Sequence, residues 1–225
     1  MRLINSTIFK RRGMKFFASY PLVGRYLFII FAVLLLGNCS NYKPASVNNL
    51  CSIFRGEIDW YEDAIDANKR WGTPIWVMMA FMYQESRFVD DARPDRDWFL
   101  GIIPLPRDSS AYGYAQAQDP AWQDYRRATG NNGADRDDFA DAIDFIGWYT
   151  HETQRQLGIS KWDAYNQYLA YHEGRGGFRR GSWKKKAWLQ KVAINVKNQA
   201  AGYSQQLKSC QAELDDKAGG WFGFF

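Results

Sequence analysis

The sequence of 225 residues has few of the side chains that bind transition metals. It contains two histidines and three cysteines, and the spacing of the cysteines matches no zinc-binding pattern. Two histidines leave little support for a tetrahedral zinc site built from nitrogen and sulfur ligands. We therefore expect no metal ion and no other cofactor.

Acidic residues are missing from the first 38 positions, which hold six basic residues. The whole chain carries 29 basic and 24 acidic residues, a formal net charge of +5. Without positions 1–38 the count becomes 23 basic against 24 acidic residues, a formal net charge of −1. The basic balance belongs to the N-terminal segment, and we expect no nucleic-acid partner.

A hydrophobic run long enough to cross a bilayer, about 20 residues, is also missing at the N-terminus. The apolar stretch Tyr26–Leu36 is shorter, and it follows a basic region. This order is typical of a secretory signal peptide, here residues 1–38, which is removed on export. Translation starting at Met14 would give a shorter signal.

The end of the signal segment, Leu-Gly-Asn-Cys at positions 36–39, resembles a bacterial lipobox, with Asn38 in place of the usual small residue. The resemblance implies lipidation of Cys39 and a location in the periplasm. Because Ser40 follows the cysteine, it also implies attachment to the outer membrane through the lipid anchor. An ordinary signal peptide and an uncleaved anchor are the alternatives.

Two cysteines remain once Cys39 is assigned to lipid, and two cysteines in an exported protein usually pair. We expect a disulfide between Cys51 and Cys210, joining the start of the folded domain to its last helix. The polar stretch 39–50 is typical of a tether. The sequence thus predicts one folded domain over residues 51–210 and a flexible aromatic tail over residues 211–225.

The pattern that follows predicts the central helix of the fold. Thr73 suits the N-cap and Pro74 the first turn, and residues 75–83 are all apolar or aromatic, which predicts a helix buried on every side. Glu85 stands at its end, where burial of a carboxyl group raises the pKa, as a general acid requires. Alternatively, Glu85 merely ends the helix, either exposed or paired with Arg87.

Helical periodicity predicts further helices over residues 57–70, residues 135–157 and residues 183–207. Ser182 is the expected cap of the last of these helices. A capping box from Ser160 to Asp163 predicts the start of another helix, which the glycines at 174, 176 and 177 are expected to break. The sequence therefore predicts an all-α fold.

The segment 88–111 has the composition of a long loop, and it contains the aromatic pair Trp98 and Phe99. A loop of this length without structure of its own is usually functional or mobile. These two rings either stack on sugar rings or fix the loop to the core.

Three short motifs occur in order along the chain: Glu85-Ser86, Gly113-Tyr114-Ala115-Gln116, and Ala170-Tyr171-His172-Glu173-Gly174. Together they resemble the SLT-domain (soluble lytic transglycosylase) enzymes of bacteria. Those enzymes carry a Glu-Ser pair, a Gly-Leu-Met-Gln-like segment and an Ala-Tyr-Asn-Ala-Gly segment on a lysozyme-like (goose-type) α fold. The resemblance covers about residues 57–205, and three motifs in the correct order are more specific than any one of them.

The resemblance implies a role for each matching residue. Glu85 is expected to be the catalytic acid and base, and Ser86 to support the site or the substrate. Gln116 is expected to bind the N-acetylated sugar. Tyr114, in the position of an apolar family residue, is also expected to contact the substrate. Tyr171 is expected to orient the acid or to stabilise the charged transition state.

The implied substrate is the glycan strand of peptidoglycan. The implied reaction breaks the β-1,4 bond between N-acetylmuramic acid and N-acetylglucosamine and forms 1,6-anhydro-muropeptides without water. Two alternatives remain from different classes. One is a lysozyme-type hydrolase on the same fold, and the other is a peptidoglycan-binding lipoprotein without catalytic activity.

Two residues of the third motif depart from the family pattern, His172 for Asn and Glu173 for Ala. In a hydrolase of the inverting type, a second carboxylate about 6.5–9.5 Å from Glu85 would activate water. Side chains two residues apart on a helix point in different directions, so we expect Glu173 to point away from the cleft if Tyr171 faces Glu85. It is expected either to pair with Arg175, Arg179 or Arg180, or to hold the glycine turn that follows.

Overall fold

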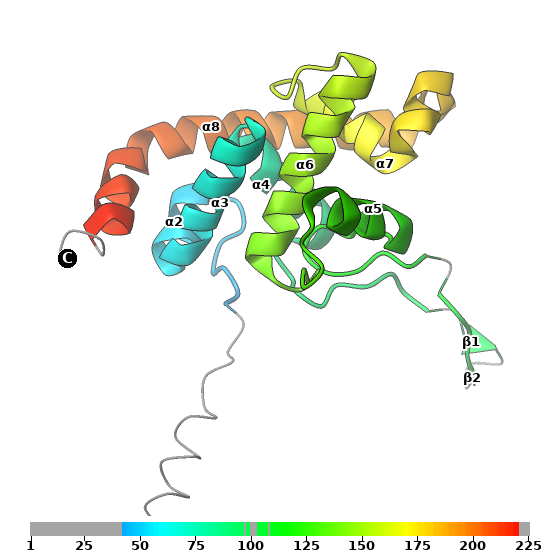
Figure 1. Ribbon diagram of the computed structural model, residues 1–225, viewed down its shortest axis with the longest axis horizontal. Coiled ribbons are helices and arrows are strands. Elements are labelled where there is room, and N and C mark those ends of the chain that lie inside the picture. The colour runs from blue at the N-terminus through cyan, green and yellow to red at the C-terminus, as the bar shows by residue number, and fades with distance from the viewer. Residues whose placement is uncertain (1–41, 97, 100–102, 108, 221–225) are drawn as a thin grey trace, which may run out of the picture. The chain divides into compact units, whose positions relative to one another are not determined.

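The structure, a computed structural model, describes residues 42–96, 98–99, 103–107 and 109–220. These residues form a helical domain, which confirms the all-α prediction (Figure 1). The elements in chain order are α2 (Leu50–Gly56), α3 (Ile58–Trp71), α4 (Ile75–Ser86), β1 (Trp98–Phe99), β2 (Ile103–Pro104), α5 (Asp119–Thr129), α6 (Phe139–Leu157), α7 (Ala164–Arg180), the 3₁₀ helix η1 (Ser182–Lys185) and α8 (Ala187–Gly220). The predicted signal peptide and Cys39 lie outside the described residues.

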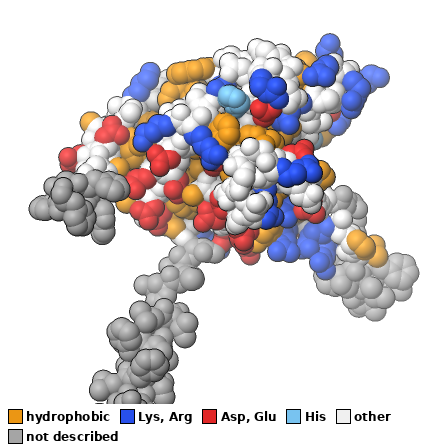
Figure 2. Space-filling view, in the orientation of Figure 1, with side chains coloured by type: hydrophobic (Ala, Val, Ile, Leu, Met, Phe, Trp, Pro, Cys, Tyr) orange, Lys and Arg blue, Asp and Glu red, His pale blue; other side chains and the backbone are white. Residues whose placement is uncertain are grey.

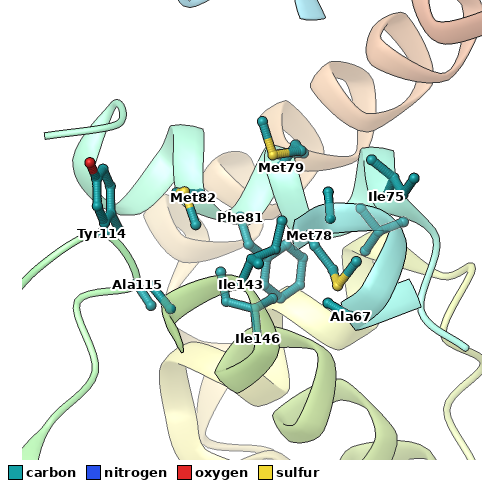
Figure 3. Packing of buried hydrophobic residues seen from close by; sticks show 14 of the residues in the cluster. Ala67, Ile75, Met78, Met79, Phe81, Met82, Tyr114, Ala115, Ile143 and Ile146 are labelled. Carbon is teal, nitrogen blue, oxygen red and sulfur yellow. The ribbon is translucent and has the colours of Figure 1, made fainter. Parts of the chain in front are cut away.

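Helix α4 is the centre of the core, as its composition predicts. Every residue from Val77 to Met82 is at most 1% exposed. The helix packs against α3, α6 and α8, and Figure 3 shows its side chains among those of the neighbouring elements. Trp76 and Tyr83, near the two ends of the apolar run, are partly exposed. The rigid central helix fixes the position of Glu85 at its C-terminal end.

The start of α4 differs from the prediction. Pro74 occupies the N-cap position, and no side chain caps the helix. The hydroxyl group of Thr73 lies 2.7 Å from the hydroxyl group of Thr150 in the interior. A buried hydroxyl group needs a hydrogen-bond partner inside the protein, and Thr73 has this partner on α6. Thr73 therefore connects the start of α4 to α6 and does not cap α4.

The end of α4 is strained. Arg87 and Phe88 both have positive φ angles, 52° and 63°, which residues other than glycine seldom adopt. The side chain of Phe88 is buried, with its ring 6.0 Å from that of Trp60. Such backbone strain persists where the surrounding packing holds it. The chain thus turns sharply away directly after Glu85.

Helices α3 and α6 follow their predictions within a few residues. Asp138 caps α6 by accepting a hydrogen bond from the Asp141 N–H group, and Gly158 ends it at φ 69°. Helix α7 starts later than predicted, because Asp163 itself is the N-cap and accepts from the Asn166 N–H group. It kinks at Gly174, where φ is 69° and ψ is 152°, and then continues through the other two glycines.

Helix α8 runs along the helical body to Gly220, well past its predicted end at residue 207 (Figure 1). Leu214 is buried, and Asp215 accepts a hydrogen bond of 2.6 Å from the hydroxyl group of Tyr61. Residues 211–220 are therefore a packed helix and not a flexible tail. Ser182 lies in η1 and does not cap α8.

The first described residues also pack on the domain, contrary to the predicted tether. The Tyr42 ring lies 5.0 Å from that of Trp60, and the Tyr203 hydroxyl group donates to the carbonyl group of Val47. Helix α2 follows, and a disulfide joins its Cys51 to Cys210 of α8. Helices α2 and α5 were not predicted from the sequence.

Candidate active site

An open cleft of about 490 Å³ lies where several elements meet. Its walls come from the C-terminal end of α4, the segment that leads into α5, one face of α6, and α7 near its kink. The lining includes Glu85, Gln116, Phe145, Tyr149, Tyr171, His172, Glu173 and Gly174. Each of the three sequence motifs thus contributes to one cleft.

Glu85 is partly buried at the end of α4, facing this cleft. Burial raises the pKa of its carboxyl group to about 7, because it disfavours the charged form. A hydrogen bond from the Tyr168 side chain acts in the opposite direction and favours the carboxylate. Glu85 can therefore release and take up a proton near neutral pH, as a single acid and base must.

The alternative in which Glu85 pairs with Arg87 is wrong. The guanidinium group of Arg87 donates a hydrogen bond of 2.9 Å to the Tyr83 hydroxyl group and lies over the Tyr83 ring. The left-handed conformation of Arg87 at the end of α4 directs the chain away from the helix axis. Glu85 keeps its place in the cleft without a cationic partner among its described contacts.

Ser86 is buried, and its hydroxyl group donates to the carbonyl group of Met82 at 3.3 Å. This is a bond to the preceding turn of the same helix, and the residue is not part of the cleft lining. Ser86 is therefore a structural residue in the last turn of α4. It offers no contact for a substrate.

The second motif forms a tight turn above the cleft. Gly113 has φ 76°, and a Cβ atom at this position would stand 1.9 Å from the carbonyl oxygen of Arg136, so only glycine fits. The Gln116 amide nitrogen donates to the carbonyl groups of Ala92 at 2.8 Å and Gly113 at 2.9 Å. Because both amide hydrogens serve this turn, the remaining polar atom of the Gln116 side chain is its carbonyl oxygen.

Tyr114, which the resemblance predicts as a substrate contact, does not line the cleft. It is 4% exposed and packs edge-on against Trp60 and Phe139 in the core. Residues on either side of a tight turn point in different directions, so the motif brings Gln116 to the cleft and Tyr114 to the interior. Tyr114 thus takes the position of the apolar family residue as a buried core side chain.

Tyr171 lies in the cleft but does not itself donate to Glu85. Its hydroxyl group donates a hydrogen bond of 2.6 Å to the carbonyl group of Ala115, which joins the third motif to the second. Burial and the nearby charge of Glu85 raise the pKa of Tyr171, so it remains a protonated donor. The tyrosine that bonds to the acid is Tyr168, one helical turn earlier.

Tyr168 was missed in the sequence although a signal existed. Residues three apart on a helix lie on the same face, so a tyrosine three positions before Tyr171 was a second candidate to reach Glu85. The side chain is 3% exposed, and its ring lies 5.3 Å from that of Phe81 on α4. Packing between α4 and α7 thus sets the position of the donor.

Glu173 lines the cleft, contrary to the expectation that it points away. It stands at the kink before Gly174, where the cleft extends round the end of the regular part of α7. Its predicted arginine partners are also wrong. The carboxylate accepts from Lys186 at 2.7 Å, from the hydroxyl group of Ser182, and lies 3.2 Å from Nδ1 of His172.

The described part of the chain contains no group of three or more His, Cys, Asp or Glu side chains placed to bind a metal ion. Within the same residues, no helix has the length and apolar character needed to cross a membrane. The side chains of Trp98 and Phe99 lie outside the described part, so both alternatives for them, stacking on sugar rings or fixing the loop to the core, stay predictions.

A comparison with protein families matches residues 27–210 to the family described as transglycosylase SLT domain. This range covers most of the chain and contains all the motifs that meet in the cleft. Searches of curated proteins and of solved structures gave no match.

Proposed function

The chain belongs to the transglycosylase SLT domain family of peptidoglycan lytic transglycosylases, and we propose that Glu85 is its single catalytic acid and base. The observation that carries the proposal is the position of Glu85 in the cleft with a pKa of about 7. A protonated carboxyl group at this position suits the transfer of a proton to a glycosidic oxygen.

The proposed reaction has two steps. Glu85 donates its proton to the bridging oxygen as the bond from C1 of N-acetylmuramic acid breaks, and the acetamido group of the same sugar stabilises the cation. The Glu85 carboxylate then takes the proton of the muramic 6-hydroxyl group while the oxygen of that hydroxyl group bonds to C1. The product is a 1,6-anhydro sugar, and Glu85 returns to its protonated form without any water.

Gln116 and Tyr171 support this reaction in different ways. The carbonyl oxygen of Gln116 can accept a hydrogen bond from the acetamido N–H group of a bound sugar. Tyr171, held by Ala115, fixes the turn of the second motif against α7. Tyr168 orients the carboxyl group of Glu85 and acts as a positioning residue.

The hydrolase alternative requires a second carboxylate that activates water, and Glu173 is the candidate because it lines the cleft. Burial opposes its charged form, but hydrogen bonds from Lys186, Ser182 and His172 lower the pKa of Glu173 to about 2. Such a carboxylate is a weak base, and both of its oxygens already have donors. These contacts favour the single-carboxylate mechanism.

Product masses test the proposal. Digestion of purified peptidoglycan should give 1,6-anhydro-muropeptides, each one water lighter than the corresponding lysozyme product, and Glu173→Gln should give the same products. Reducing-end muropeptides as the main products, together with inactivity of Glu173→Gln, would establish hydrolysis. A protein that binds peptidoglycan but releases no fragments would be a binding lipoprotein.

We also propose that the protein is a periplasmic lipoprotein, attached to the outer membrane through Cys39. The lipobox-like sequence before this residue supports the proposal. Cells that express the protein should incorporate a fatty-acid probe into it, and Cys39→Ala should remove the label. Equal labelling of the two proteins would show that Cys39 is not the acylated residue.

A further inference from the structure

His172 and Glu173, the two residues by which the third motif departs from the family pattern, contact one another, and His172 also contacts an aromatic side chain of α8. Glu173 is 4% exposed at its side chain, although it carries a charge. Lys186 and Ser182 hold it from the segment that leads into α8. Its Oε1 atom also lies 3.2 Å from Nδ1 of His172, so the carboxylate fixes the imidazole ring.

The His172 ring, fixed by Glu173, lies at the rim of the cleft. It lines the cleft and lies edge-on to the indole ring of Trp188, with centroids 5.2 Å apart and planes at 77°. Trp188 stands in the first turn of α8 and is 57% exposed. Trp188, in contact with a residue that lines the cleft, exposes more than half of its surface and so presents an apolar ring to solvent beside the cleft.

We propose that Trp188, supported by His172, is an outer saccharide subsite, which binds a sugar ring of the glycan strand beyond those held in the cleft. The proposal rests on the proposed function. An indole ring offers a large rigid apolar face with little loss of conformational entropy on binding. The apolar face of a pyranose ring fits such a surface, and its hydroxyl groups remain in water.

The charge of the surroundings fits the same occupant. Peptidoglycan strands carry acidic peptides on their lactyl groups, and exposed basic side chains flank the start of α8 in the sequence. They are Arg179, Arg180, Lys184, Lys185 and Lys191. In Figure 2, basic side chains gather at the end of the molecule where Figure 1 places the last turns of α7.

The chain offers a matched control in Trp162, which is 68% exposed. Its ring lies against that of Trp76, 5.3 Å away, and neither residue lines the cleft. Removal of either Trp162 or Trp188 deletes an exposed indole ring from the surface. Only Trp188 has a contact that leads into the cleft.

The test measures kinetics on glycan strands of increasing length. Trp188→Ala should raise KM about tenfold on long strands, leave kcat near the wild-type value, and leave the shortest cleaved strand unaffected. Trp188→Phe should restore part of the lost affinity, and Trp162→Ala should behave as wild type. Equal KM values for Trp188→Ala and Trp162→Ala at every length would overturn the subsite.

Binding to the inactive protein separates this proposal from the proposed function. In a Glu85→Gln background, Trp188→Ala should weaken binding of uncleaved long strands to the same degree, whatever the products of the active enzyme are. Unchanged strand binding would refute the subsite and leave the catalytic proposal standing. Loss of binding to anionic lipid vesicles with unchanged strand binding would instead assign Trp188 to a membrane surface and overturn the proposal.

Discussion

Glu85→Gln should reduce peptidoglycan cleavage about a thousandfold or more while leaving the affinity for uncleaved strands near that of the wild type. The substitution keeps the shape of the side chain and its contact with Tyr168 but removes the proton that must be transferred. General acid and base catalysis contributes about 10²–10⁴-fold per step, and the proposed mechanism uses Glu85 in both steps. Release of anhydro-muropeptides measures the loss, and binding to insoluble peptidoglycan measures the retained affinity.

Asp63 provides the matched control. Burial and neighbouring acidic residues raise the pKa of Asp63 to about 7 as well, but it lies in a separate pocket beside Asp66 and Asp144. Asp63→Asn therefore removes an acid with a similar pKa away from the cleft, and it should retain cleavage. Wild-type activity in Glu85→Gln, or equal losses in the two variants, would exclude Glu85 as the catalytic residue.

The pH dependence follows from the protonated form of Glu85. The first step needs the acid, so the rate should fall as the pH rises through about 7. The hydrogen bond from Tyr168 favours the carboxylate and lowers the pKa, so Tyr168→Phe should raise the pKa further. The alkaline limb of the profile should then move to higher pH, a shift that a purely structural defect would not produce.

The same acid should lower the stability of the folded protein above neutral pH. The pKa of Glu85 rises from 4.5 to about 7 on folding, so the folded state binds more protons between these values. Below about pH 4.5 Glu85 is protonated in both states and does not lower the free energy of unfolding. The free energy of unfolding then decreases as the pH rises to about 7. Glu85→Gln should therefore stabilise the protein by about 2–3 kcal/mol near pH 8, measured by urea unfolding, and by little near pH 4.

Features set by local sequence were predictable in this protein. The continuous apolar run of α4 predicted a helix buried on all sides, and this in turn predicted the raised pKa of Glu85. Helix α6 was found from its period, its acidic start and Gly158. The resemblance of the three motifs to the SLT-domain enzymes predicted Gln116 and Tyr171 as site residues, and both line the cleft.

Features set by packing between distant segments were not predictable. Which tyrosine of α7 meets Glu85 depends on the rotation of α7 against α4, and no local pattern distinguishes Tyr168 from Tyr171. Glu173 was assigned arginine partners near in sequence, but η1 brings Lys186 to it. The last turns of α8 were assigned to a flexible aromatic tail because their partners, such as Tyr61, lie far back in the chain.

Removal of the Cys51–Cys210 disulfide should cost about 4–5 kcal/mol of stability. The bond closes a loop with a sequence separation of 159 residues, and in the chain-entropy model longer loops restrict the unfolded chain more. Both cysteines are buried where α2 meets α8. The reduced protein therefore loses stability mainly because its unfolded state gains freedom.

Other contacts should keep the native junction in place without the disulfide. The Leu50 N–H group donates to Gln206 at 2.7 Å, and Arg55 pairs with Glu213 at 2.6 Å. The Cys51→Ala, Cys210→Ala double variant should thus retain cleavage at 25 °C, as the disulfide lies outside the cleft, but unfold at a much lower urea concentration. Arg55→Ala, which removes an exposed ion pair between the same two helices, should unfold close to the wild-type midpoint. Alkylation of the exported wild-type protein without reductant should label neither cysteine. Two labelled thiols, or a double variant as stable as Arg55→Ala, would show that the bond does not stabilise the protein.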